Sequence, residues 1–221
     1  MSVQTTATLL GDLVSANPNA ARVLDAHGLD YCCGGRRSLA DACAEADIDA
    51  DAVLNDLSAA PEATGVDATA LDNAELIDHI VSIHHEYLWR EMPRLTELAN
   101  KVARVHGGNH AELREVQKTY QALVLDLTDH LMTEEQEQFP AIKADRADLS
   151  ETGVAKLMGE HDVAGELLAR LRELTDGYTV PADGCASYQA LYAGLAELET
   201  DLHTHIHKEN NILFPRLLSN A

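Results

Sequence analysis

The chain has 221 residues, which is enough for one or two domains with a sizeable buried core. Its formal net charge of −21 excludes nucleic acid and anionic membranes as partners, because binding to phosphates needs clustered Lys and Arg side chains. No run of apolar residues approaches the roughly 18 that a membrane-spanning helix needs.

Cysteine usage and the first residues indicate a cellular compartment. Cys32, Cys33, Cys43 and Cys185 are not spaced like a disulfide framework. The first 16 residues lack the basic segment that precedes the apolar core of a signal peptide. We therefore expect the protein in the reducing cytoplasm.

Short helical patterns fill the first part of the chain, at residues 8–16, 18–27, 38–46 and 51–57. Asn17 and Pro18 are typical of the cap and first position of the second helix, which Gly28 ends. Ser38 with Asp41 three residues later resembles a capping box for the third helix. Residues 1–60 are therefore predicted to form a small N-terminal helical domain.

A stretch of small, polar, Pro- and Gly-containing residues follows, and we interpret residues 61–71 as a linker. Four longer amphipathic patterns come next, at about residues 72–105, 110–143, 152–174 and 185–218. Short connections at 107–108, 147–151 and 177–184 separate them, and Pro93 predicts a kink in the first. The predicted fold is all-α, with an antiparallel four-helix bundle over residues 72–221.

A repeated motif is the strongest functional signal. His130 precedes Glu134 by four residues, and His205 and Glu209 repeat this pair with an offset of 75 residues. In both copies Phe-Pro begins five residues after the Glu. Residues four apart lie on the same face of a helix, so each copy presents an imidazole and a carboxylate together.

The other two bundle helices supply the remaining candidate ligands. His161 lies on an apolar stripe of the third helix, and counting back 76 residues leads to His85 in the first. His84 is a rival, but its flanking positions are only half apolar, whereas those around His85 match those around His161. We therefore choose His85.

Six side chains are thus predicted to face the bundle interior, namely His85, His130, Glu134, His161, His205 and Glu209. Buried without partners, each polar group would cost on the order of a few kcal/mol. Bound metal removes this cost, and two carboxylates can bridge two ions. The donor set suits iron, with zinc and manganese as alternatives. Six side chains do not saturate two octahedral ions, which leaves positions for oxygen, peroxide, nitric oxide or water.

The other histidines are assigned weaker roles. His79 and His203 are expected to face solvent or partners, and His110 and His207 to lie on solvated helix faces. His84 and Glu160 are candidates for supporting the ligands. His106 precedes the Gly-Gly turn, where it is either a helix-terminal cation or a functional group.

A second motif, Cys32-Cys33-Gly34-Gly35, lies in the N-terminal domain. A disulfide between adjacent cysteines is strained, because their Cα atoms are only about 3.8 Å apart. We expect both thiols to be exposed, with Arg36 and Arg37 lowering their pKa, and to serve redox exchange, metal transfer or soft-metal contact. The alternative is that two small residues merely fill a tight turn. Cys43 and Cys185 are interpreted as structural.

Together these motifs resemble the repair-of-iron-centres family of di-iron proteins. The resemblance rests on Leu29-Asp30-Tyr31-Cys32-Cys33-Gly34-Gly35, His85-Glu86, His130-x3-Glu134, His161-Asp162 and His205-x3-Glu209-Asn210-Asn211-x2-Phe214-Pro215. It covers essentially the full chain. It implies a hemerythrin-like bundle and a carboxylate-bridged pair of iron ions on the six residues above, with Glu134 and Glu209 bridging.

The resemblance implies repair of iron–sulfur clusters damaged by oxidative or nitrosative stress, with iron supply to the clusters as the expected activity. The expected partners are damaged iron–sulfur proteins or a cluster-assembly scaffold, and a homodimer is left open. Two alternatives remain. One is an enzyme that reduces nitric oxide or peroxide, and the other is a sensor of nitric oxide or oxygen. We favour a repair protein over an enzyme.

Overall fold

The structure is a computed structural model that describes residues 4–144 and 151–219. Within these ranges the regular structure is helical, apart from one isolated β-bridge between Leu9 and Ser38. The all-α prediction is therefore confirmed. The predicted connection at 147–151 falls mainly on residues outside the described part.

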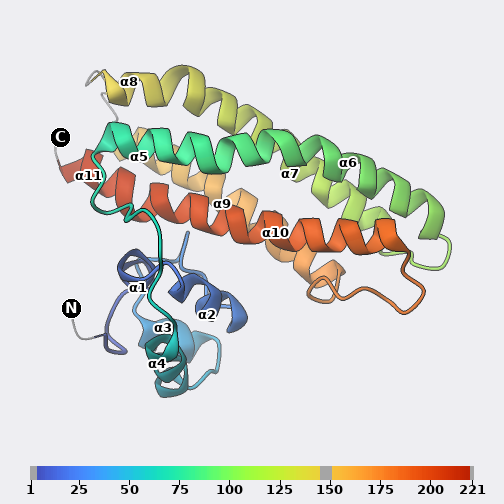
Figure 1. The fold of residues 1–221 in the computed structure, drawn as a ribbon, viewed down its shortest axis with the longest axis horizontal. Coiled ribbons are helices and arrows are strands. Elements are labelled where there is room, and N and C mark those ends of the chain that lie inside the picture. Colours follow the sequence, from blue (N-terminus) through green and yellow to red (C-terminus); the bar gives the residue numbers. More distant parts are fainter. Residues whose placement is uncertain (1–3, 145–150, 220–221) are drawn as a thin grey trace. The chain divides into compact units, whose positions relative to one another are not determined.

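The chain divides into two compact units. One comprises residues up to Leu76, a short segment at Leu149–Val154 and the C-terminal residues from His203. The other comprises Ile77–Asp148 and Ala155–Leu202. Each unit is described by itself below, and Figure 1 gives the element labels.

The first unit begins with four short helices, α1 (Leu10–Ala16), α2 (Ala20–Ala26), α3 (Leu39–Glu45) and α4 (Ala50–Ala59). Helix α2 begins two residues later than predicted, because the Asn17 side chain accepts a hydrogen bond from the Asn19 backbone N–H in a turn ahead of it. The other local signals agree with the structure. The hydroxyl of Ser38 accepts from the backbone N–H of Asp41 at 3.1 Å, and Gly28 ends α2 with φ +67°.

The C-terminal residues of the chain belong to this same unit. They comprise the end of helix α10 (Ala186–Lys208), the π-helix η3 (Glu209–Leu213) and helix α11 (Phe214–Ser219). Helix α1 packs directly against η3. The Arg216 guanidinium also donates to the backbone carbonyl of Leu71 at 2.7 Å. The beginning and end of the chain thus share one core.

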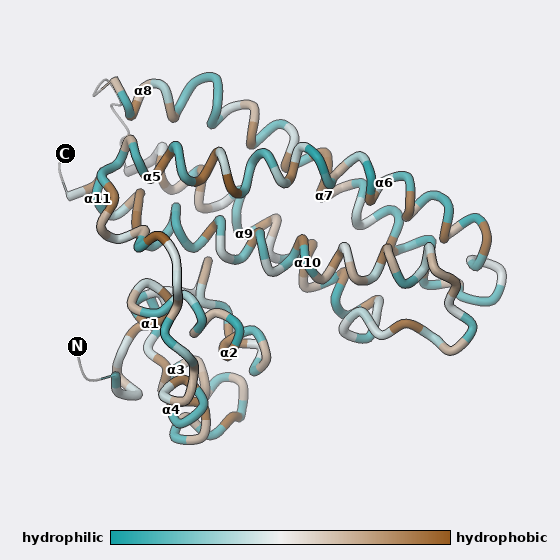
Figure 2. Tube along the Cα trace, in the orientation of Figure 1, coloured by the Kyte–Doolittle hydropathy of each residue, from teal (hydrophilic) through white to brown (hydrophobic). Residues whose placement is uncertain are grey.

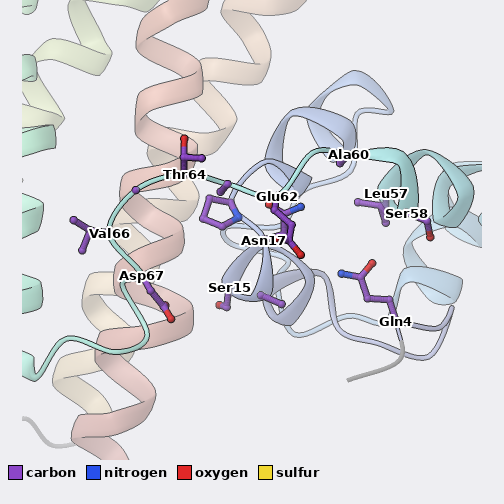
Figure 3. Close-up of a pocket in the computed structure, with 14 residues that line it drawn as sticks. Gln4, Ser15, Asn17, Leu57, Ser58, Ala60, Glu62, Thr64, Val66 and Asp67 are labelled. Atoms are coloured by element: carbon purple, nitrogen blue, oxygen red, sulfur yellow. The ribbon is translucent and has the colours of Figure 1, made fainter. Parts of the chain in front are cut away.

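A hollow of about 610 Å³ lies in the first unit between the end of α1, the end of α4 and the segment after it (Figure 3). Its walls are mostly small or polar residues such as Ser15, Asn17 and Thr64. Glu62 and Asp67 are its only titratable side chains, and no His or Cys lines it. This hollow therefore lacks the donor groups of a metal centre.

The second unit is built from long helical rods. They contain α5 (Asn73–Ile80, from Ile77), η1 (Val81–His85), α6 (Glu86–His106), α7 (Leu113–Thr133), η2 (Glu134–Gln138), α8 (Phe139–Lys143), α9 (Glu151–Leu174) and α10 as far as Leu202 (Figure 1). Polar and apolar residues alternate along each rod in Figure 2, as expected for amphipathic helices that bury one face. Helix α6 continues through Pro93 to His106, so the proline does not end it.

Four side-chain contacts join these rods in a closed ring. The Tyr120 hydroxyl of α7 donates to the Met92 carbonyl of α6, and His130 of α7 contacts Glu160 of α9. Arg172 of α9 pairs with Glu199 of α10 at 2.6 Å. Asp201 of α10 bonds to His84 of η1 at 2.8 Å. The rods therefore form the four-helix bundle that the sequence predicts.

Three π-helical segments interrupt the long helices, and the 3.6-residue periodicity did not predict them. Two of them, η2 and η3, are directly followed by a Phe-Pro pair, and the prolines of these pairs are Pro140 and Pro215. A proline inside an α-helix clashes with the carbonyl four residues earlier and leaves it without its N–H partner. The wider π turn ahead of the proline accommodates both effects. The Phe-Pro pairs therefore account for two of the three segments.

In the described residues, no helix combines the length and apolar composition that crossing a membrane requires.

Candidate metal centre

Three rods of the second unit bring four of the predicted ligands together. The Nε2 atoms of His85 and His130 lie 3.5 Å and 3.3 Å from Oε2 of Glu134. The Nε2 atoms of His130 and His161 are 3.1 Å apart. All four side chains are buried, with His130 the most exposed at 7%. Ligand atoms of His130, Glu134 and His161 all lie within 4.8 Å of one another, so the group could hold an ion.

These separations fit donors that share a metal ion. Two ligand atoms about 2.1 Å from one ion lie about 3.0 Å apart at a right angle and about 3.4 Å apart at the tetrahedral angle. The observed 3.1 Å between His130 and His161, and 3.3 Å between His130 and Glu134, match this range. Imidazole nitrogens with a carboxylate oxygen are donors that iron, zinc and manganese accept.

Carboxylates on the far side of two imidazoles orient them. Oε1 of Glu135 lies 3.0 Å from Nδ1 of His85 and also accepts from the Trp89 indole N–H at 2.8 Å. Glu160 lies 3.0 Å from Nδ1 of His130. A carboxylate at Nδ1 favours the tautomer with its proton there, so that Nε2 carries the lone pair that binds metal. Burial opposes ionisation of Glu160, but the hydrogen bonds and charges of His130 and Lys156 together outweigh it and lower the pKa of this carboxyl group.

The two adjacent histidines of η1 have different surroundings. The His85 side chain reaches Glu134, and its ring stacks on Phe139 with centroids 5.6 Å apart. The His84 side chain is also buried, but its Nδ1 bonds to Asp201 at 2.8 Å. The π turn Val81–His85 contains both residues.

The first unit holds the second copy of the His-x3-Glu motif. Nε2 of His205 lies 3.1 Å from Oε1 of Glu209, and both side chains are almost fully buried. Glu209 is the first residue of η3, as Glu134 is the first residue of η2. The two copies therefore share their local backbone as well as their spacing.

The Cys-Cys-Gly-Gly turn packs on the residues that directly follow Glu209. The Asn211 side-chain amide donates to the backbone carbonyls of Tyr31 at 3.2 Å and Cys32 at 3.0 Å. Gly35 lies so close that a Cβ atom there would be 2.4 Å from Oδ1 of Asn211. The tight approach requires glycine at this position.

Comparison with known proteins supports these motifs. A model of the hemerythrin HHE cation-binding domain matches residues 76–217, and a domain of unknown function (DUF542) named ScdA_N matches residues 6–61. The chain is 37% identical over 211 residues to an iron–sulfur cluster repair protein YtfE of an Enterobacter species, covering 95% of this chain and 96% of the relative. Proteins of the same name from Salmonella paratyphi B and Salmonella newport match with the same identity and coverage.

The chain belongs to the repair-of-iron-centres family. The bundle of this family member is accordingly a hemerythrin-like domain, as the motifs predicted.

The expectation of two exposed, acidic thiols is wrong for Cys32. Its side chain is buried, and its pKa is raised well above the ordinary value by hydrogen bonding to Cys33, by burial and by the nearby charge of Asp30. Arg37, expected to lower the thiol pKa, instead pairs with Glu45 at 2.6 Å. The sequence shows that arginines lie close to the thiols along the chain, but it does not show which carboxylates these arginines pair with.

Two histidines assigned to solvent or partners lie in the core of the first unit or at its edge. His207 is 3% exposed, contacts the Ser15 hydroxyl at 3.3 Å and lies edge-on to the Tyr31 ring. Burial lowers its pKa to about 4. His203 bonds to Asp25 at 3.0 Å. Both face the N-terminal helices, a surface that the bundle pattern alone does not reveal.

Three residues with evident roles were given no role by the sequence analysis, namely Asp30, Glu135 and Asn211, although Asp30 and Asn211 lie within the motifs that carry the family resemblance. Each lies close to a predicted site residue, because Asp30 lies two residues before Cys32, Glu135 follows Glu134 and Asn211 lies two residues after Glu209. Such adjacency is the sequence signal that could have identified them.

Proposed function

We propose that this protein is a di-iron protein of the cytoplasm that repairs iron–sulfur clusters damaged by oxidative or nitrosative stress, by supplying iron to them. The observation that carries the proposal is the buried convergence of His130, Glu134 and His161, within 4.8 Å, in a chain whose relatives are named iron–sulfur cluster repair proteins. Its partners are then proteins with damaged clusters or a scaffold that assembles clusters.

In this proposal six residues hold two iron ions. They are the six residues predicted from the sequence, namely His85, His130, Glu134, His161, His205 and Glu209. Glu134 and Glu209 would be the carboxylates shared by the two ions. The matched His–Glu separations of 3.3 Å and 3.1 Å, and the start of a π turn at each Glu, support equivalent roles for the two copies.

Bound iron would supply redox chemistry and open coordination positions. The chain itself orients and shields the donors. Glu135 and Glu160 hold the Nδ1 sides of two imidazoles, and Phe139 covers the face of His85. Loss of iron leaves buried carboxylates and imidazoles with less compensation for their burial, so folding and metal retention are coupled.

The test is transfer of iron to a damaged cluster. Full-length protein loaded with ferrous iron should restore activity to a dehydratase whose cluster has been broken by peroxide, in proportion to the iron supplied. The His161→Ala variant should not, whereas His110→Ala, at a histidine bonded to Asp183 away from the donors, should act like the wild type. Equal repair by the metal-free protein or by His161→Ala would contradict the proposal.

The alternative is an enzyme that reduces nitric oxide or peroxide, and it is favoured because six side chains would not saturate two octahedral ions. Such an enzyme would catalyse many turnovers, whereas a repair protein would release its iron stoichiometrically. Consumption of many equivalents of peroxide or nitric oxide per chain, with an added electron donor and no loss of iron, would support the alternative. Iron release with at most one turnover supports the repair function.

A further inference from the structure

The turn after α2 gathers a carboxylate and two thiols that the dinuclear centre does not use. Sγ of Cys32 lies 3.2 Å from Oδ1 of Asp30 and 4.0 Å from Sγ of Cys33. Ligand atoms of these three residues all lie within 4.8 Å of one another. Both cysteines are free thiols.

These separations resemble those around a single tetrahedral ion. Two sulfur atoms about 2.3 Å from one such ion lie about 3.8 Å apart, and an oxygen at about 2.0 Å lies about 3.5 Å from either sulfur. The measured 4.0 Å and 3.2 Å are close to these values. Small side-chain rotations would bring all three donors to one ion.

Backbone contacts hold the carboxylate and the turn in place. Asp30 accepts hydrogen bonds from the backbone N–H groups of Cys32 and Cys33, both at 3.0 Å, and of Gly34 at 2.8 Å. Asn211 binds the carbonyl of Cys32 from the other side. Each carboxylate oxygen can accept more than one bond, so these contacts leave acceptor capacity for an ion.

Access and charge also suit a cation. Asp30 is exposed and Cys33 is partly exposed, so an ion can reach the group from solvent, while Cys32 forms its buried side. With both thiols deprotonated, the three side chains carry three negative charges. A divalent ion offsets two of them.

We propose that Asp30, Cys32 and Cys33 bind one thiophilic divalent transition ion, such as zinc or ferrous iron, at a site separate from the dinuclear centre. Thiolate sulfur selects ions of this class over magnesium or calcium. The ion binds thiolates rather than thiols, so affinity falls as pH decreases. The fourth position is left for water or for a ligand from another molecule. This site goes beyond the proposed function and does not depend on it.

Cobalt(II) titration of the full-length, reduced, metal-free protein tests this site. Thiolate bound to cobalt gives a near-ultraviolet charge-transfer band, which histidine and carboxylate ligands do not produce. Wild type should develop this band and saturate it by three equivalents per chain, two of which occupy the dinuclear centre. Cys33→Ser should abolish it, and Asp30→Asn should weaken binding at least tenfold. Cys185→Ser, which removes an exposed thiol elsewhere, should leave it unchanged.

A second measurement keeps the proposal testable if a variant fails to fold. In wild-type protein, zinc in excess of three equivalents per chain should slow alkylation of Cys33 by N-ethylmaleimide at least tenfold, while Cys185 reacts at its original rate. Absence of the cobalt band in the wild type, its persistence in Cys33→Ser, or alkylation of Cys33 unaffected by zinc would each overturn the proposal. Loss of the band in Cys185→Ser would show that Cys185 is the cobalt ligand, and this result would also overturn the proposal.

Discussion

The side-chain amide of Asn211 donates to the backbone carbonyl of Cys32 at 3.0 Å, which joins the thiol turn to the π-helix that begins at Glu209. The same amide reaches the carbonyl of Tyr31. Residues about 180 positions apart in the chain are therefore held together beside one of the proposed ligands. This contact makes the conformation of the turn dependent on the C-terminal helix.

Asn211→Ala should lower the free energy of unfolding by about 1–3 kcal/mol, because two backbone carbonyls lose their partner in a partly buried place. It should also speed alkylation of Cys33 by loosening the turn. Urea denaturation and peptide mass spectrometry measure the two effects. Asn55→Ala, at an exposed position of α4, is the matched control and should change neither. Equal behaviour of the two variants would contradict the role of Asn211.

Gly35→Ala should destabilise the protein by about 1–3 kcal/mol through overpacking. The added Cβ would lie 2.4 Å from Oδ1 of Asn211 and 2.5 Å from the Tyr31 carbonyl, so side chain and backbone must both shift. Gly159→Ala is the opposite case. Gly159 is exposed within α9 with open space around its Cβ position, and alanine there should stabilise by up to about 1 kcal/mol. Thermal unfolding of both variants measures these changes in stability. If Gly35→Ala leaves the stability unchanged, the close packing at Gly35 is contradicted.

Glu135→Gln should weaken metal binding by about 10- to 100-fold, because the carboxylate that orients His85 is lost. Glu137→Gln, an exposed glutamate of the same π turn, is the control and should bind metal like the wild type. Competition with a chromophoric chelator measures both affinities. If the two variants bind equally, Glu135 does not support the ligand.

Cys185 should alkylate with a midpoint near pH 7. Its thiol pKa is lowered to about 7 from an ordinary 9.0 by the backbone N–H of Tyr188 and by His106, whose Nε2 lies 3.2 Å from Sγ. At pH 7 about half of Cys185 is then thiolate, against about 1% for an ordinary thiol of pKa 9. Reaction should therefore slow as pH falls below 7, and His106→Gln should move the midpoint upward. Iodoacetamide labelling resolved by peptide tests this, and a midpoint near 9 in the wild type would contradict it.

Hydrophobic periodicity and helix punctuation were sufficient to predict the all-α fold and the four rods. The burial of His207 was not predictable from the bundle stripe, because the surface that covers it comes from residues such as Ser15 and Tyr31, far away in sequence. The raised pKa of Cys32 likewise was not predictable, because it depends on which groups lie beside the thiol in the folded turn. The π turns were missed because each is a single five-residue segment inside a long helix, although Pro140 and Pro215 follow two of them.

The most direct test of the account is the iron content of the full-length chain. After anaerobic loading with ferrous iron and removal of the excess, elemental analysis should find two iron ions per wild-type chain. The Glu134→Ala variant should retain fewer than one, because it lacks a bridging carboxylate. Fewer than one iron per wild-type chain, or an unchanged content in Glu134→Ala, would contradict the dinuclear centre.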